Sequence, residues 1–184
     1  LAAAGAVLRP VGVHRRARGV PVGQAVHERE GQPDPGLVGE RGVIVYSDDD
    51  GESWTQADVP VFETLTSVTF VNEQVGWAAG HSAVVLHTED GGETWTKQID
   101  GFEVSRLRAE GARKALEAAR ESGADRDTIG QLEYELSEAK SALKEGPSTP
   151  FLDVWFRDER VGFAVGGFGL ALKTTDGGQS WTYW

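Results

Sequence analysis

Residues 87–97 read HTEDGGETWTK, and this stretch decides the fold because its pattern occurs three times in the 184-residue chain. Residues 46–56 read YSDDDGESWTQ, and residues 173–183 read KTTDGGQSWTY. Each copy places Ser or Thr, Asp, Gly, Ser or Thr, and Trp at the same intervals. A chemical site is rarely built three times in one chain, whereas a structural unit often is. The pattern therefore predicts a structural repeat.

The repeat extends well beyond this short box. Residues 65–95 align with residues 151–181 without a gap, and 13 of the 31 positions are identical. Half of a further copy begins at Gly39, and its Trp54 lies 41 residues before Trp95. Short alternating segments with Gly-rich turns indicate antiparallel strands. Roughly forty residues per sheet, repeated, indicate a β-propeller built from four-stranded blades.

The box itself has the chemistry of a tight turn. An Asp side chain can accept hydrogen bonds from the N–H groups of its own turn, and Gly can adopt the positive φ that a hairpin needs. A buried Trp removes about 150–250 Å² from water and could contribute up to about 4–6 kcal/mol before entropy is subtracted. We therefore assign a structural role to Ser47, Asp49, Gly51 and Trp54, to Thr88, Asp90, Gly92 and Trp95, and to Thr174, Asp176, Gly178 and Trp181.

A helical segment interrupts the repeats. Residues 103–146 are rich in Ala, Glu, Arg, Lys and Leu. Two sets of apolar residues recur every three or four positions, which places each set on one face of a helix. They are Ala109, Ala112, Leu116 and Ala119, followed by Ile129, Leu132, Leu136, Ala139 and Leu143. We expect a self-contained hairpin of two antiparallel helices, and a docking arm for a partner is the alternative.

Residues 1–38 fit neither pattern, since they hold five arginines, no lysine and scattered Pro and Gly. We expect this segment to be disordered or mistranslated, through an upstream frameshift, a misjudged gene start or a degenerate blade. The chain has no methionine and is expected to be a piece of a longer protein. The predicted domains are the segment 1–38, one and a half blades at 39–101, the hairpin at 102–147 and a blade truncated at its C-terminus at 148–184.

The boxes resemble the Asp-box, or BNR repeat, of sialidases, Vps10-type receptors and other propellers. The longer pattern is Val-x-Phe, Gly-Trp/Phe-Ala-x-Gly, an apolar strand and Thr-x-Asp-Gly-Gly-x-Thr/Ser-Trp. It resembles the photosystem II assembly and stability factor family over about residues 39–100 and 150–184. This resemblance implies a seven-bladed propeller that binds and chaperones subunits of a membrane complex without catalysing a reaction. The fold class expected is therefore a mostly β partial propeller of four-stranded Asp-box blades with an inserted α-helical hairpin.

Composition excludes several other classes of function. The formal charge of −11 argues against nucleic acid or an anionic membrane as the main partner. The absence of cysteine rules out disulfides and thiolate metal sites. The segment DDDGE at 48–52 does not complete an EF-hand loop, and the four histidines lack the spacing of metal ligands. We expect no metal, no cofactor and no membrane-spanning segment.

Sialidases are enzymes that share the Asp-box. Their chemistry needs an arginine cluster, a Tyr/Glu nucleophilic pair and an Asp acid. The propeller-like part offers only Arg41, Arg157 and Arg160, and the Phe/Tyr-Arg-Ile-Pro motif of those enzymes is absent. We therefore expect no enzyme and no catalytic residues. A sialidase-type glycoside hydrolase stays an alternative, as does a secreted receptor-like binding module.

If the propeller binds a partner, the turns between strands should carry the surface. The equivalent turns NEQ at 72–74 and RDER at 157–160 are expected at one end of neighbouring blades. We choose Arg157 and Arg160 as the partner-binding candidates, because arginine is enriched at binding hot spots. The expected partner is a protein, a subunit of a membrane complex. The expected location is an exported compartment, namely the periplasm, thylakoid lumen or extracellular space.

Overall fold

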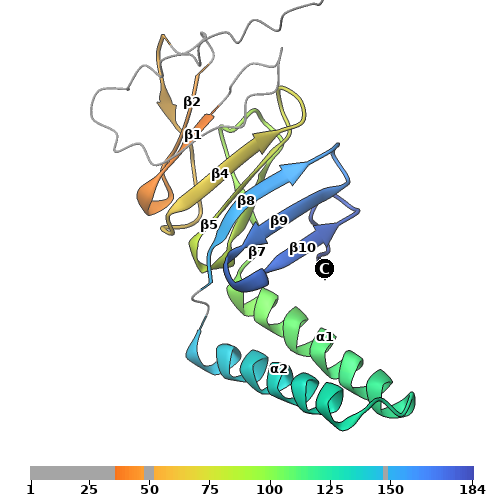
Figure 1. The fold of residues 1–184 in the computed structure, drawn as a ribbon. Helices are drawn as coiled ribbons and strands as arrows, with labels where there is room; N and C mark the ends of the chain where they lie inside the picture. The colour runs from red at the N-terminus through yellow and green to blue at the C-terminus, as the bar shows by residue number, and fades with distance from the viewer. Residues whose placement is uncertain (1–35, 48–51, 147–148) are drawn as a thin grey trace, which may run out of the picture.

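Three antiparallel sheets and one helical hairpin make up the structure, a computed structural model that describes residues 36–47, 52–146 and 149–184 (Figure 1). The expectation of disorder or mistranslation for residues 1–35 lies outside this range. The first sheet holds β1 (Gly36–Val38), β2 (Ile44–Tyr46) and β3 (Thr55–Gln56). The second holds β4 (Leu65–Phe70), β5 (Gly76–Gly80), β6 (Val85–Thr88) and β7 (Thr96–Ile99). The third holds β8 (Phe151–Phe156), β9 (Gly162–Gly166), β10 (Ala171–Thr174) and β11 (Thr182–Tyr183).

Each sheet is an up-and-down meander whose strands pair in sequence order. The second and third sheets share one register, since Val68 pairs with Ala78 as Val154 pairs with Ala164. Both also carry an irregularity near the start of their first strand. The first strands β4 and β8 lie side by side, so the sheets fan out from this edge as blades do. The predicted mostly β partial propeller is confirmed.

Two observations bear on the expected domain limits. Within the described residues, strand pairing is already present before residue 39, because Leu37 and Val38 pair with Val45 and Ile44. A strand of three residues is too short to show the alternating pattern of a strand in the sequence, so β1 was not predicted. The third sheet has four strands, and its last strand is short, since only Thr182 and Tyr183 pair with β10.

The core lies between successive sheets. We call the face of a sheet toward the preceding sheet its front face, and the opposite one its back face. Front-face residues of the second sheet pack against the first, and these are Leu65, Val68, Phe70, Ala78, Leu86 and Trp95. Front-face residues of the third sheet pack against the second, and these are Phe151, Val154, Phe156, Ala164, Leu172 and Trp181. Each described interface between sheets therefore has two layers, the back face of one sheet and the front face of the next.

Aromatic stacking joins the second sheet to the third. The Trp77 and Phe156 rings are parallel within 5°, with centroids 3.5 Å apart, and both side chains are fully buried. Gly76 and Gly162 make room for the rings on their own sheets. A Cβ at either glycine would lie within 2.6 Å of Phe70 or Phe156. Glycine at these positions therefore follows from close ring packing.

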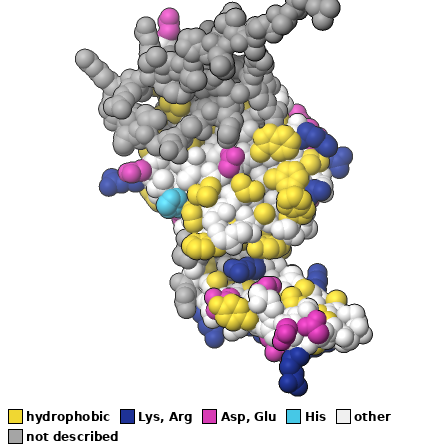
Figure 2. Space-filling view, viewed as in Figure 1, with side chains coloured by type: hydrophobic (Ala, Val, Ile, Leu, Met, Phe, Trp, Pro, Cys, Tyr) yellow, Lys and Arg dark blue, Asp and Glu magenta, His cyan; other side chains and the backbone are white. Residues whose placement is uncertain are grey.

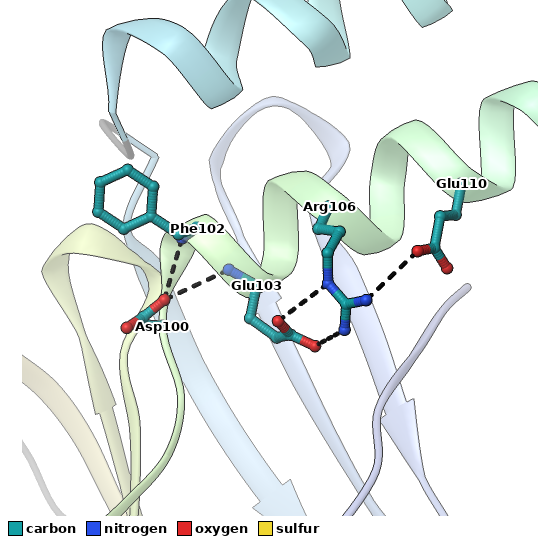
Figure 3. Close-up of polar contacts among 5 residues, drawn as sticks. All are labelled: Asp100, Phe102, Glu103, Arg106 and Glu110. Carbon is teal, nitrogen blue, oxygen red and sulfur yellow. Dashed lines mark hydrogen bonds and ion pairs between the residues drawn. The ribbon is translucent and has the colours of Figure 1, made fainter.

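The predicted helical hairpin is confirmed as α1 (Gly101–Glu121) and α2 (Arg126–Glu145). Asp100 starts α1 by accepting hydrogen bonds from the N–H groups of Phe102 and Glu103, at 3.1 and 3.3 Å (Figure 3). Arg106 pairs with Glu103 and Glu110 on the exposed side of this helix, and such pairs add little stability. Val104 joins the core cluster between the second and third sheets, while the rest of the hairpin projects away from them (Figure 1).

Neither helix combines the length and apolar composition that a bilayer crossing requires, and this finding covers only the described ranges.

Candidate functional site

The second Asp-box closes the turn between β6 and β7 with its own side chains. Thr88 Oγ1 donates to Asp90 Oδ1 at 2.7 Å and accepts from the N–H of Gly92 at 3.0 Å. Asp90 Oδ1 also accepts from the N–H of Thr94 at 3.0 Å. Trp95 folds back over the turn and donates from Nε1 to the Gly92 carbonyl at 3.0 Å. The side chains therefore satisfy backbone groups of one turn and leave no reactive arrangement.

The third Asp-box repeats this geometry. Thr174 Oγ1 donates to Asp176 Oδ1 at 2.8 Å and accepts from the N–H of Gly178 at 2.9 Å. Asp176 Oδ1 accepts from the N–H of Ser180 at 2.9 Å. Trp181 is 5% exposed, like Trp95 at 4% in the second box. Its Nε1, however, has no hydrogen-bond partner among the described residues.

The first Asp-box lies partly outside the described residues. Asp49 and Gly51 fall in the segment 48–51, so no geometry is assigned to them. Ser47 and Trp54 flank this segment and are both half-buried.

The third box also links its sheet to the second. The carbonyl of Gly177 accepts from Trp77 Nε1 at 3.2 Å and from Gln98 Nε2 at 2.8 Å. A Cβ at the adjacent Gly178 would lie 1.9 Å from Gln98 Oε1. The turn thus forms part of the interface between two sheets. The spacing of residues in the sequence did not predict this contact.

The two turns chosen as binding candidates lie together. Asn72 Nδ2 donates to Glu159 Oε1 at 2.8 Å, which joins the turn of the second sheet to that of the third. A concave region of about 720 Å³ opens between them. Its lining consists of Val71, Asn72, Arg157, Asp158, Glu159, Arg160, Val161 and Thr175. The hollow is large enough for a short peptide segment.

Asp158 organises the backbone of this turn. It accepts hydrogen bonds from the N–H groups of Val161 and Arg160, at 2.8 and 2.9 Å, and from Arg157 Nε at 2.8 Å. The Val161 N–H and then the Arg157 side chain are the main causes that hold the pKa of Asp158 at about 2. The carboxylate is therefore charged at neutral pH, and it partly neutralises Arg157.

Arg160 presents the more available positive charge. It is exposed, and no carboxylate of the described ranges forms an ion pair with it. Its own carbonyl accepts from the N–H of Gly177, which fixes the turn against the third Asp-box. A rigid backbone under an unpaired guanidinium suits recognition of a carboxylate or a carbonyl group.

The groups that a sialidase site would need do not lie together among the described residues. Arg41 lies in the turn after β1, which is equivalent to the turns after β5 and β9, whereas Arg157 and Arg160 lie in the turn after β8. Successive turns of a meander alternate between its two ends, so Arg41 belongs to the opposite end of the sheets. Tyr183 Oη donates to the Gly169 carbonyl at 3.3 Å. No arginine cluster faces a tyrosine in the part of the chain that is described.

The histidines and acidic residues form no metal site in the described ranges, where no group of three potential ligands comes together. His87 is half-buried and its ring contacts Trp77, with centroids 4.9 Å apart. Burial lowers the pKa of His87, and the nearby Glu89 opposes that shift. The ring therefore packs in the sheet as a neutral group at pH 7.

Sequence reasoning missed a hollow at the base of the hairpin. It has a volume of about 340 Å³ and lies between α1, α2 and the turn after β9. Arg108, Glu138, Ser141, Phe168 and Tyr183 are among its lining residues. No sequence pattern pointed to it, because helices and sheet approach each other there only in the folded chain.

Comparison with known families shows a match over part of the chain. Residues 27–103 match the family model described as Photosynthesis system II assembly factor YCF48. The match begins inside the segment 1–38, to which no repeat was assigned. No protein of curated function matches the sequence.

Two solved structures are similar to this chain. One is YCF48 bound to D1 peptide, with 18% identity and a TM-score of 0.49 over 80% of this chain. The other is YCF48 from Cyanidioschyzon merolae, with 14% identity and a TM-score of 0.47 over 80% of this chain. The chain spans only 35% and 36% of the length of these two proteins. The resemblance to the photosystem II assembly factor family, inferred from the paired repeats, is confirmed by the family match over residues 27–103.

Proposed function

We propose that the chain is a non-catalytic, protein-binding propeller segment that serves the assembly or stability of a membrane protein complex. The observation that carries the proposal is the family match over residues 27–103, which covers the first two sheets of the repeated scaffold. The partner is a subunit of that complex, and the chain acts in an exported compartment. No specific observation favours the hydrolase or receptor-like alternatives.

The binding surface is the concave region between the turns 72–74 and 157–160. Arg160 supplies an unpaired charge, and Arg157 supplies a second guanidinium that Asp158 orients through a 2.8 Å hydrogen bond. Such a pair fits a peptide segment that carries a carboxylate, because guanidinium groups bind carboxylates in a planar geometry. The net charge of −11 disfavours nucleic acid as the partner.

A labelled D1 peptide is the first probe, since YCF48 in a similar solved structure is bound to D1 peptide. Binding is measured by fluorescence anisotropy with the full chain and with the double variant R157Q/R160Q. We expect the double variant to raise Kd by about tenfold or more, because hot-spot arginines carry much of an interface's free energy.

The matched control is R113Q/R120Q, which removes two exposed arginines from the projecting hairpin and changes the net charge equally. Its Kd should stay at the wild-type value. An equal loss of affinity in both double variants would show a general charge effect and would overturn the proposed surface. Absence of peptide binding by the intact, folded chain would overturn the proposed partner class.

A further inference from the structure

The hollow at the base of the hairpin has walls from two parts of the fold. Helices α1 and α2 supply one wall, and the turn after β9 together with β11 supplies the other. Its volume of about 340 Å³ is in the range of small-ligand sites. Figure 2 shows hydrophobic, basic and acidic side chains meeting where the hairpin joins the sheets. The hollow lies at the opposite end of the sheets from the turns 72–74 and 157–160, because successive turns of a meander alternate between its ends.

Arg108 brings a positive charge to this hollow without a counterion. It is half-buried, and no carboxylate in the described part of the chain forms an ion pair with it. In contrast, three exposed arginines of the same hairpin are each paired with a glutamate, namely Arg106, Arg113 and Arg120. A partly buried charge is screened less by water and salt than an exposed one. Arg108 is therefore the arginine of the hairpin that gains most from a bound anion.

Phe168 places an aromatic ring at the same hollow. Its side chain is 92% exposed, and its backbone is left-handed, with φ 56° and ψ 35°. This conformation is costly for a bulky residue. The equivalent turn of the second sheet has Ser82 at φ 56°, so the turn itself does not require an aromatic side chain. Tyr183 Oη donates to the Gly169 carbonyl at 3.3 Å and so fixes the turn beside the ring.

Glu138 is the acidic residue of the lining, and it bears on the sign of the ligand's charge. It is exposed, so water solvates its carboxylate, whereas Arg108 is half-buried. The charge that has lost more of its water gains more from a bound partner. The hollow therefore favours an anion over a cation.

We propose that this hollow binds a carboxylate that is attached to an aromatic or other apolar group. Arg108 donates to the carboxylate, because a guanidinium can bind both of its oxygens in one plane. Phe168 and Leu170 contact the apolar part of the ligand. A free small acid and the C-terminal residue of a peptide share this chemistry. The site is independent of the surface formed by Arg157 and Arg160, since the two lie at opposite ends of the sheets.

The first probe is hydrocinnamate, added to the isotope-labelled full chain and followed by NMR. The backbone amide signals of Ser105, Ala142 and Phe168 should shift, and those of the turns 72–74 and 157–160 should not. A Kd in the millimolar range is expected for a ligand of this size. Hydrocinnamamide lacks the charge and propionate lacks the ring, so each should bind about fivefold or more weakly. Equal binding of the amide, or no binding of hydrocinnamate to the folded chain, would overturn the proposal.

Charge variants test the role of Arg108. R108Q should raise the Kd for hydrocinnamate by about fivefold or more. The matched control R113Q removes an exposed arginine from the same helix and should keep the wild-type Kd. E138Q should lower the Kd by about twofold, because it removes a like charge from the lining. An equal loss in R108Q and R113Q, or a higher Kd in E138Q, would overturn the proposal.

A ring variant tests the site without changing a partly buried charge. F168S introduces the residue type of the equivalent turn, and it should raise the Kd for hydrocinnamate by about threefold. The control F62S changes a phenylalanine that is 89% exposed and does not line the hollow, and its Kd should stay at the wild-type value. An unchanged Kd in F168S would show that the ring takes no part and would overturn the assignment of an apolar ligand.

Two further arms identify the source of the carboxylate and separate this site from the proposed function. Tighter binding of acetyl-Ala-Ala-Phe than of hydrocinnamate would support the site and assign it to a peptide C-terminus, whereas weaker binding would support the site and assign it to a free small acid. R108Q should bind the labelled D1 peptide with the wild-type Kd, and R157Q/R160Q should bind hydrocinnamate with the wild-type Kd. A parallel loss of both ligands in either variant would overturn the independence of the two sites.

Discussion

At the scale of single residues, the aspartate of the Asp-box accepts hydrogen bonds from both side-chain and backbone donors of its own turn. Hydrogen bonds from the Ser180 side chain and backbone are the largest causes that hold the pKa of Asp176 below its ordinary value. For Asp90, burial raises the pKa, but hydrogen bonds from Thr94 and Thr88 outweigh that effect and lower it overall. In both boxes the turn favours the charged carboxylate.

This preference predicts how stability depends on pH. A carboxyl group whose pKa is lower in the folded state adds stability above its unfolded pKa, and that stability is lost as pH falls through the folded pKa. Asp176→Asn should cost about 1–2 kcal/mol of unfolding free energy at pH 7, because the charged acceptor is lost. The difference from wild type should shrink below about pH 4, where the wild-type group begins to protonate in the unfolded state.

Urea unfolding at pH 7 and pH 3 measures this difference. The control is Glu121→Gln, which removes an exposed carboxylate at the end of α1, outside any Asp-box, and should change the free energy of unfolding little at pH 7. A destabilisation by Asp176→Asn of equal size at both pH values would contradict the electrostatic explanation. The effect would then come from the shape of the side chain and not from its charge.

At the scale of single elements, the Asp-box turns of the second and third sheets differ in what packs against their second glycine. Gly92 and Gly178 both have positive φ, at 96° and 88°, so a side chain at either position strains the backbone. At position 92 the nearest atom to a Cβ is Phe70 Cζ at 3.4 Å. At position 178 it is Gln98 Oε1 at 1.9 Å, which belongs to the neighbouring sheet.

We therefore expect Gly178→Ala to destabilise the protein more than Gly92→Ala. Both should cost about 1 kcal/mol from backbone strain, and Gly178→Ala should cost about 1–3 kcal/mol more because Gln98 must move. Thermal unfolding of the two variants gives the comparison. In the double variant G178A/Q98A the extra cost should largely disappear, and a strictly additive double variant would contradict the steric explanation.

At the scale of the whole molecule, stability resides in contacts between sheets. The Trp77–Phe156 stack, with centroids 3.5 Å apart, joins the second sheet to the third across the insert of two helices. The hairpin, in contrast, reaches the core through its base at Val104. Sheets and hairpin should therefore respond differently to core mutations.

Phe156→Ala is expected to cost about 3–5 kcal/mol, because it leaves a cavity between two sheets. Leu116→Ala removes a buried side chain of the hairpin, which is 6% exposed. Hydrogen exchange should speed up in β4 to β11 for the first variant and only in α1 and α2 for the second. Equal acceleration everywhere in both variants would show that hairpin and sheets unfold as one unit.

Much of this architecture followed from local chemistry. Thr88-x-Asp90-x-Gly92 brings hydroxyl, carboxylate and flexible backbone into one turn, and the contacts of such a turn span at most four residues. The helical spacing of Leu132, Leu136 and Ala139 likewise appears within two turns of a helix. These features were predictable because the interacting groups are close in sequence.

The sequence by itself determined that the chain repeats an Asp-box sheet, where its strands turn and where two helices interrupt it. The tertiary structure alone decided that Gln98 meets Gly177, that Asn72 meets Glu159 and that Trp77 stacks on Phe156. These pairs are 79 or more residues apart in sequence, and a side-chain period shows which face is apolar but not what covers it. The physical reason is that a repeat encodes the surface of each sheet locally, whereas the choice of neighbour arises only when the sheets pack.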